Sequence, residues 1–204
     1  MQYSRYPIAL IAWISLIIQV YLTSTTVPEG ELLSSELANL LSYFTILTNL
    51  LAASSLTFVN TRFFSDNRTH GAITVYIVAV GLIYALVLQK LYDPQGLNLF
   101  TDVAFHYITP SLYLMHWLFV VEKGDYVWPD ALRWLIFPGA YLIYTLFRGS
   151  ITGWYPYPFI DVTELGYLYA IRNSLAVAGV FWVLGMGVVA IDKAMSRPER
   201  IGSN

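Results

Sequence analysis

The sequence predicts an all-α, polytopic membrane protein: a six-transmembrane-helix bundle with both termini in the cytoplasm. Its composition is the first indication. Hydrophobic residues make up 57% of the 204 residues and charged residues only 12%, whereas a soluble domain carries about 25% charged residues. The second indication is that the apolar residues gather into uncharged runs of the length that a helix needs to cross a hydrocarbon core of about 30 Å.

Six apolar segments stand out, and no internal repeat or shift in composition separates them. We therefore expect residues 1–204 to form a single six-transmembrane domain. The first segment is followed by TSTTVPEGE, which lacks a small-x-small cleavage motif, so we interpret it as an uncleaved span. The predicted spans are residues 6–22, 37–58, 71–88, 103–121, 131–147 and 166–191.

The basic residues predict the orientation of the bundle, because cytoplasmic loops are enriched in Lys and Arg. With the amino terminus inside, only Lys90, Arg148 and Arg172 of the 11 basic residues fall on the outer side. Both termini are therefore expected in the cytoplasm. The formal glycosylation sequon that begins at Asn67 would also lie inside, so we expect no glycan there.

Composition also excludes several kinds of chemistry and partner. The sequence has no cysteine, which excludes disulfides, a thiol nucleophile and a thiolate metal site. The net charge is −2, with no basic block, so we expect no nucleic-acid partner. The expected partners are the bilayer and a lipid.

Polar residues recur on one side of the second apolar segment. Asn39, Ser42, Thr45, Thr48 and Asn49 are spaced by threes and fours, which places side chains on one face of a helix. One interpretation is structural, since Ser and Thr bond back to the i−4 carbonyl in membrane helices and Asn bonds to a neighbouring helix. The other interpretation is that one hydroxyl faces a cavity as a nucleophile, which requires a nearby base.

His106 is the candidate base. An ionisable residue inside a membrane span indicates a functional role by default, and the predicted topology puts both His106 and Thr45 in the outer half of the bilayer. Near the start of the fourth segment, the positive end of the helix dipole would favour the neutral ring that a general base needs. Asp102, four residues earlier on the same face, is expected either to orient this ring or to cap the helix.

The other two histidines predict no metal or haem site. His116 follows His106 by ten residues, about 15 Å along a helix, and we interpret it as an interhelical or inner-interface residue. His70, at the inner end of the third segment, is expected to be solvated. A bis-histidine haem needs imidazoles from different helices at one depth, and zinc needs three or four converging ligands. We therefore expect no metal and no cofactor. The GxSx element of a rhomboid-type serine protease is also absent.

The predicted outer loop between the last two segments contains GWYPYPFID, residues 153–161. Two prolines fix φ and remove backbone donors, so this stretch should be rigid and extended. Its aromatic residues are expected either to form an interfacial belt or to cover a cavity, with Tyr155, Tyr157 or Asp161 supplying hydrogen bonds.

Two outer cations flank this loop. Arg148 and Arg172 either bind an anionic group of the substrate or reach lipid phosphates. If an ester is cleaved nearby, an oxyanion must be stabilised by hydrogen-bond donors. The candidates are Asn49, Tyr107 and Tyr157.

Three segments together resemble the six-span androgen-induced family of membrane proteins, which includes bacterial members: FTILTN in the second apolar segment, His106-x-x-x-Pro110 in the fourth, and GWYPYPFID after the fifth. The resemblance extends from the second segment to the sixth, which is most of the chain. It implies a membrane hydrolase that cleaves fatty acid esters of hydroxy fatty acids with a threonine nucleophile and a histidine.

The family's nucleophile follows an aromatic-apolar pair, so the resemblance assigns this role to Thr45, after Tyr43 and Phe44, and the histidine role to His106. The histidine-to-proline spacing is one residue shorter than in animal members. Thr48 and Asn49 stand where an acidic residue is expected. These departures concern the substrate more than the Thr–His pair.

The sequence thus predicts an intramembrane lipid-ester hydrolase of the threonine type. The alternatives are a non-catalytic lipid-binding or transport protein that uses the same polar cavity, and a bundle in which Thr45 only bonds to the carbonyl of Leu41. The predicted site comprises Thr45 and His106 as catalytic residues; Asn49, Thr48, Asp102, Tyr107, Tyr157 and Asp161 as support or oxyanion residues; and Arg148, Tyr155 and Arg172 as substrate-binding residues.

Overall fold

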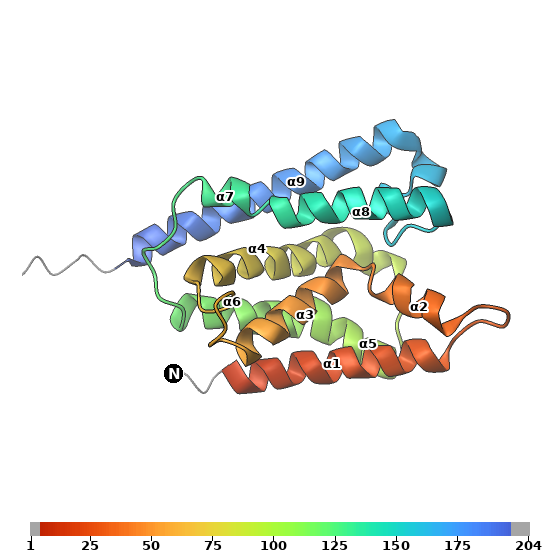
Figure 1. The fold of residues 1–204 in the computed structure, drawn as a ribbon, viewed down its shortest axis with the longest axis horizontal. Coiled ribbons are helices and arrows are strands. Elements are labelled where there is room, and N and C mark those ends of the chain that lie inside the picture. Colours follow the sequence, from red (N-terminus) through yellow and green to blue (C-terminus); the bar gives the residue numbers. More distant parts are fainter. Residues whose placement is uncertain (1–4, 197–204) are drawn as a thin grey trace, which may run out of the picture.

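The computed structural model describes residues 5–196, which fold into helices and connecting loops without any strand (Figure 1). The elements are α1 (Arg5–Thr25), α2 (Leu33–Leu40), α3 (Phe44–Thr57), α4 (Asn67–Ile83), the π-helical η2 (Tyr84–Leu88), the 3₁₀ turn η3 (Gln89–Leu91), α5 (Leu97–Val103), the π-helical η4 (Ala104–Ile108), α6 (Thr109–Phe119), α7 (Asp130–Arg133), α8 (Ile136–Thr152), the 3₁₀ turn η5 (Pro158–Ile160) and α9 (Val162–Met195).

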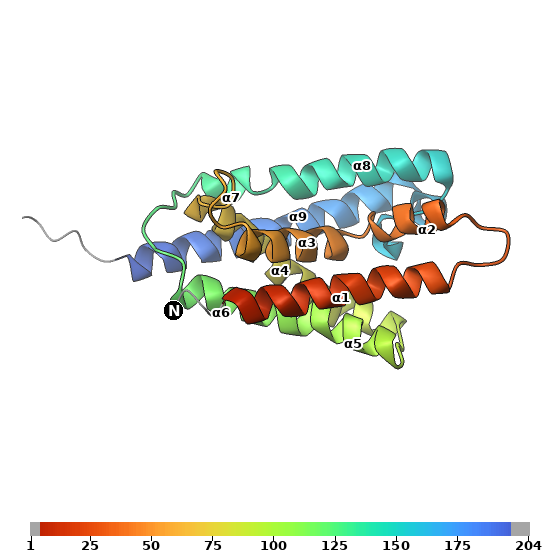
Figure 2. The ribbon, with the colours of Figure 1, turned by 60° about the horizontal axis from the view of Figure 1, so that its bottom comes forward.

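The long helices lie side by side along one axis, and successive passes of the chain run in opposite directions (Figures 1 and 2). Helices α8 and α9 form one layer, α1, α5 and α6 form another, and α3 and α4 lie between them (Figure 1). Helix α4 is central, since it packs against α3, α6 and α9. Helix α1 begins and α9 ends at the same end of the bundle (Figure 1).

Three helical stretches of the described chain are each long and apolar enough to cross a membrane: Arg5–Thr25, Asn67–Leu91 and Val162–Met195. They correspond to the first, third and sixth predicted spans. A fourth crossing is obtained if the bent pair α2 and α3 counts as one span. The fourth predicted span corresponds to the run from α5 to α6, which η4 interrupts, and the fifth corresponds to the 17 residues of α8.

The outer faces of these helices are apolar, as expected of surfaces that contact lipid rather than water. On α1 the exposed side chains include Leu10, Ile14 and Ile17, which recur at helical spacing on one side. Helices α8 and α9 carry similar faces. Their exposed apolar residues include Ile136, Ile143, Phe147 and Ile151 on α8, and Leu168, Leu175 and Val183 on α9. Together with the helix lengths, these faces indicate a helical membrane protein.

The prediction of one continuous helix over residues 37–58 is wrong. The chain bends by 72° between α2 and α3, so Asn39 and Ser42 do not share a helix face with Thr45. Side chains stabilise the bend: the Ser42 hydroxyl donates to the Ala38 carbonyl at 2.7 Å, and the Tyr141 hydroxyl of α8 donates to the Ser42 carbonyl at 2.8 Å. The carbonyl released by the bend therefore keeps a partner, as buried backbone requires.

Both π-helical segments lie where α4 approaches the α5–α6 run. Pro110 has no N–H to donate to the carbonyl of His106, and the chain around that carbonyl widens into η4. A Cβ on Gly81 would lie 2.8 Å from the His106 carbonyl oxygen. Only glycine allows this approach. It brings the η2 segment, which follows directly, against η4.

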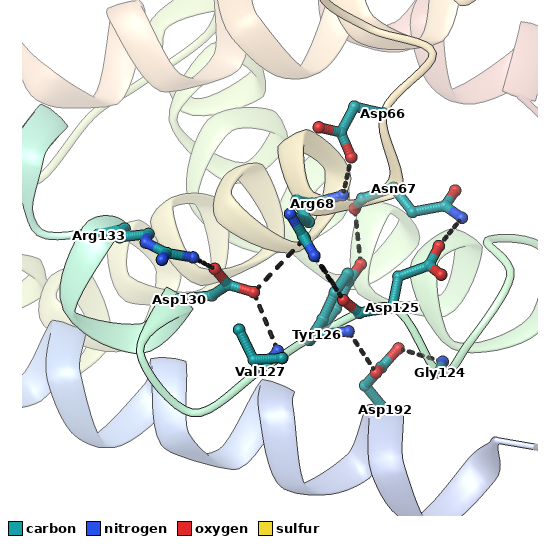
Figure 3. Close-up of polar contacts among 10 residues, drawn as sticks. All are labelled: Asp66, Asn67, Arg68, Gly124, Asp125, Tyr126, Val127, Asp130, Arg133 and Asp192. Carbon is teal, nitrogen blue, oxygen red and sulfur yellow. Dashed lines mark hydrogen bonds and ion pairs between the residues drawn. The ribbon is translucent and has the colours of Figure 1, made fainter.

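At the end where α1 begins, a polar cluster joins α9 to the loop after α6 and to the start of α4 (Figure 3). Asp192 of α9 is fully buried and accepts hydrogen bonds from the backbone N–H groups of Gly124 and Tyr126, each at 3.0 Å. The Tyr126 hydroxyl donates to the carbonyl of Asn67 at 2.7 Å. Arg68 bonds the carbonyl of Asp125, which ties the loop to α4 a second time (Figure 3).

Replacement of Asp192 by alanine is expected to destabilise the protein by about 3 kcal/mol, because two buried N–H groups lose their acceptors. The measurement is the midpoint of thermal unfolding in detergent. Glu122→Ala, at an exposed acid of the same loop, is the control and should leave the midpoint unchanged. Equal midpoints for both variants would contradict the structural role of Asp192.

Candidate active site

Thr45 lies in the first turn of α3, directly after the bend. Backbone N–H groups in a first turn have no partner within the helix, and the helix dipole makes this end favourable for negative charge. The Thr45 hydroxyl is 3.4 Å from His106 Nε2 and 3.4 Å from the Tyr157 hydroxyl. Its hydrogen-bond partners therefore lie on other parts of the chain, whereas the packing interpretation required the carbonyl of Leu41.

His106 is held from its other ring nitrogen by Asp102. Nδ1 lies 3.0 Å from the Asp102 carbonyl oxygen and 3.1 Å from Asp102 Oδ1. Both atoms can only accept a hydrogen bond, so Nδ1 carries the proton in the neutral ring. Nε2 is then the atom with a free lone pair, and it faces the Thr45 hydroxyl. This is the arrangement in which a histidine acts as a base towards a hydroxyl.

The structure resolves the two expectations for Asp102. The helix begins at Leu97, with Gly96 at the N-cap position, so Asp102 is not a helix cap. It also follows that His106 lies about two and a half turns from the helix start. The dipole acts mainly within the first turn, so the predicted dipole effect on His106 does not apply, and Asp102 is the group that orients the ring.

Tyr84 completes the site, and the sequence analysis missed it. Its ring stacks on His106 with centroids 3.7 Å apart and planes 8° apart, and its hydroxyl donates to Asp102 Oδ2 at 2.5 Å. Both Asp102 and His106 are thereby fixed from a neighbouring helix. The available signal was an isolated tyrosine in the aliphatic run GLIYALVL, three residues after Gly81.

The loop between α8 and α9 brings Tyr157 onto the other side of Thr45. The Thr45 N–H donates to the Tyr157 hydroxyl oxygen at 3.3 Å, which leaves the tyrosine proton free for donation to Thr45 Oγ1. Burial raises the pKa of Tyr157, so the hydroxyl stays protonated and able to donate. Thr45 can then accept from Tyr157 and donate to His106, so the hydrogen bonds run in one direction from Tyr157 to Asp102.

Two cavities meet at this point. A larger cavity of about 540 Å³ reaches Thr45, His106, Asp102 and Tyr84 from the side of the 92–95 loop. A smaller cavity of about 250 Å³ lies between α3, α4, α8 and α9. Thr45, Tyr157 and Leu88 line both. Sites of this size and concavity are typical of small-molecule binding.

Three predicted support residues lie away from both cavities. Asn49 is fully buried, and its amide donates to the carbonyls of Thr45 and Phe105, at 2.9 and 3.4 Å. It therefore ties α3 to η4 and does not face a substrate. Thr48 is fully buried. The Tyr107 ring lies nearly perpendicular to that of Tyr84, with centroids 5.7 Å apart. None of these three lines either cavity.

The remaining predicted residues have structural contacts instead. Asp161 caps α9 by accepting from the N–H groups of Thr163 and Glu164. Tyr155 packs onto Gly149, where any Cβ would collide with its ring. Arg148 donates to Asn39 Oδ1 at 2.6 Å and packs over Trp154. Arg172 is exposed and packs over Tyr169. None of the four lines either cavity.

The expectation that His70 is solvated is wrong. His70 is buried; its Nδ1 lies 3.0 Å from the Tyr113 hydroxyl and its Nε2 lies 3.0 Å from the Phe64 carbonyl oxygen. His116 lies close by, with ring centroids 6.4 Å apart. The two rings come from different helices, which the sequence argument about haem did not foresee. Within residues 5–196, no three His, Cys, Asp or Glu side chains converge as metal ligands.

Comparison of the chain with models of known protein families, with curated proteins and with solved structures finds no match. The class of protein is therefore defined by the structure alone. It is a helical membrane protein in which Asp102 contacts His106, and His106 contacts Thr45, beside two cavities.

Proposed function

We propose that this protein is a membrane-embedded lipid-ester hydrolase with Thr45 as nucleophile and His106 as general base. The observation that carries the proposal is the chain of hydrogen bonds in which Thr45 can donate to His106 and His106 donates to Asp102. A threonine hydroxyl is a weak nucleophile unless a base lies beside it, and here a base of the required tautomer does. The separation of 3.4 Å between Thr45 Oγ1 and His106 Nε2 exceeds the usual limit of about 3.2 Å for a catalytic hydrogen bond. In enzymes without substrate such contacts are often this long and tighten when substrate binds.

The reaction follows from these positions. His106 Nε2 takes the proton of Thr45 as Oγ1 attacks the ester carbonyl, and His106 then gives this proton to the departing alcohol oxygen. The acyl group remains on Thr45. Water next loses a proton to His106 and attacks the acyl carbonyl, and the proton returns to Thr45 as the fatty acid leaves. In both halves Asp102 stabilises the imidazolium, and no metal or cofactor is required.

Tyr157 and the first turn of α3 are the proposed stabilisers of the oxyanion. The carbonyl oxygen becomes negative next to Thr45 Oγ1, where the Tyr157 proton is already directed. The helix dipole favours negative charge at the same place. Tyr157 takes the role for which Asn49 and Tyr107 were also candidates.

Replacement of Tyr157 by phenylalanine is expected to lower kcat by about 10²-fold with little change in KM, as when one oxyanion donor is removed. The measurement is steady-state hydrolysis of a chromogenic acyl ester by the purified variant. Tyr155→Phe, which removes a hydroxyl two residues away outside the cavities, is the control. A Tyr157→Phe enzyme with unchanged kcat would exclude the tyrosine from oxyanion stabilisation.

The proposal includes the six-span topology with both termini in the cytoplasm. The chain ends that the structure describes lie at one end of the bundle (Figure 1), which fits an even number of crossings. Arg68, Lys123 and Arg133 gather at that end, which fits the enrichment of basic residues on the cytoplasmic side. The site then lies towards the outer leaflet.

The resemblance to the androgen-induced family supports the same chemistry and suggests fatty acid esters of hydroxy fatty acids, or a related lipid ester, as substrates. A non-catalytic lipid-binding or transport protein is the alternative, and cavities of this kind are compatible with it. The Asp102–His106–Thr45 chain favours hydrolysis, because binding alone needs no oriented base.

The test combines a covalent probe with a panel of lipid esters. A fluorophosphonate should label the purified protein, peptide mass spectrometry should locate the adduct on Thr45, and labelling should decrease strongly in His106→Ala. At least one lipid ester of the panel should be cleaved. A protein that binds these esters without labelling or turnover is a lipid-binding protein, and the hydrolase proposal would then be abandoned.

A further inference from the structure

Among the described residues that line the smaller cavity, only Thr45 and Tyr157 offer a ligand a free side-chain hydrogen-bond donor. Its other hydroxyls are already used: Tyr141 donates to the Ser42 carbonyl, and Ser174 donates to the Ala170 carbonyl at 2.7 Å. The rest of its lining is apolar, including Phe44, Val80, Ile83, Val177, Ala178 and Phe181. A polar ligand would lose hydrogen bonds to water there without replacement, whereas a hydrocarbon chain would gain from leaving water.

The larger cavity differs in chemistry. Its lining includes Gln19, Asn98, Thr101 and two carboxylates, Asp93 and Asp102, and no lysine or arginine from residues 5–196. It therefore suits a polar group without negative charge, since an anion would meet two acids and no cation.

We propose that the ester lies across Thr45, with its acyl chain in the smaller cavity and an uncharged alcohol portion in the larger one. This inference rests on the proposed function for the position of the ester carbonyl. Of the substrates suggested there it favours the related lipid ester, because the alcohol portion of a fatty acid ester of a hydroxy fatty acid carries a free carboxylate. The smaller cavity of about 250 Å³ holds about eight groups of the size of a water molecule, which corresponds to a medium-length chain or the first part of a longer one.

Gly139 of α8 is the position at which we propose to reduce the volume available to this acyl chain. It lines the smaller cavity and is itself exposed, so it lies at the edge of this cavity. A Cβ added there meets no atom within 4 Å. A larger side chain at this position therefore fits without displacing the backbone and occupies space that the acyl chain would use.

The experiment measures binding without requiring turnover. Fatty acids of increasing length, each with a diazirine at the terminal carbon, are photo-crosslinked to the full-length protein in detergent, and the modified peptides are located by mass spectrometry. The expected result is crosslinking to the α8 and α9 residues of the smaller cavity. Gly139→Leu should reduce this crosslinking several-fold for long chains and less for short ones.

Gly187→Leu is the matched control, because Gly187 is an exposed glycine of α9 with open space at its Cβ and lies outside both cavities. It should crosslink as the wild type does. Crosslinks to the residues of the larger cavity, or equal crosslinking in both variants, would overturn the acyl-chain assignment even if esters are hydrolysed. Normal crosslinking without hydrolysis would support the acyl site and refute only the proposed function.

A separate experiment tests the placement of the alcohol portion in the larger cavity. Two esters of the same fatty acid are compared, one with glycerol and one with a short hydroxy acid whose carboxylate is free. The glycerol ester should have the higher kcat/KM. Equal or faster cleavage of the anionic ester would overturn the placement of an uncharged alcohol in the larger cavity. If neither ester is cleaved, each intact ester is added as a competitor of the crosslinking fatty acid. The glycerol ester should then reduce the crosslinking more than the anionic ester does.

Discussion

Thr45→Val is expected to abolish ester hydrolysis and fluorophosphonate labelling. Valine keeps the branched shape of threonine and removes only the hydroxyl, so the fold and both cavities should persist. Loss of the nucleophile in an enzyme with a comparable serine relay costs on the order of 10⁶-fold in kcat. The measurements are turnover of an acyl ester and in-gel detection of the probe. Thermal unfolding is measured on the same samples.

Thr45→Ser is the matched control, because it keeps a hydroxyl at the same position. It should retain labelling at residue 45 and measurable turnover. If Thr45→Val hydrolyses esters as the wild type does, the nucleophile is elsewhere. If both variants lose activity together with thermal stability, Thr45 supports the fold, and the hydrolytic role would have to be given up.

Asp102→Asn should reduce kcat by about 10⁴-fold, the loss seen when a serine protease relay loses its orienting carboxylate in the same way. The neutral amide no longer stabilises the imidazolium. It can also donate to His106 Nδ1 in competition with the carbonyl of residue 102, which accepts from that nitrogen in the wild type, and this favours the tautomer with the proton on Nε2. That tautomer cannot accept the Thr45 proton. The measurement is steady-state hydrolysis, with binding of a crosslinking fatty acid as a second readout that should stay unchanged.

Asp93→Asn is the control for this prediction, because Asp93 lines the same cavity and its carboxylate accepts from Gln95 at 3.1 Å. This substitution should leave kcat within a few-fold of the wild type. A comparable loss in both variants would mean that the negative charge of the cavity matters rather than the orientation of His106. The Asp102–His106–Thr45 chain of contacts would then be excluded as the source of activity.

The local sequence was sufficient for the class of protein. Long uncharged runs must be buried or placed in lipid, so residues 6–22, 71–88 and 166–191 correspond to helices long enough to cross a membrane. The residue types with useful chemistry were also visible, because polar and ionisable side chains are rare in such runs. His106 was singled out for this reason, whereas Thr45 was chosen among the polar residues of its segment by the resemblance to the androgen-induced family. The structure brings the two side chains together.

The surroundings of the pair were not predictable in the same way. The bend at Ser42 is stabilised by two tyrosines of α8, about 100 residues away in sequence: the Tyr141 hydroxyl donates to the Ser42 carbonyl, and the Tyr144 hydroxyl contacts the Ser42 hydroxyl. Tyr84 reaches His106 because Gly81 allows α4 to approach the carbonyl released by Pro110. Neither contact leaves a periodic pattern in the sequence, since each depends on residues from separate helices.

The sequence by itself determined that the chain forms apolar helices and which few side chains could carry chemistry, because hydropathy and residue type act locally. Only the tertiary structure decided which of the candidates share a site. It separated Asn49, Tyr155, Asp161, Arg148 and Arg172 from the cavities, kept Asp102 and Tyr157 beside the Thr45–His106 pair, and added Tyr84. The physical reason is that hydrogen-bond direction and cavity shape depend on how separate helices approach one another, and this approach is set by packing across the whole bundle.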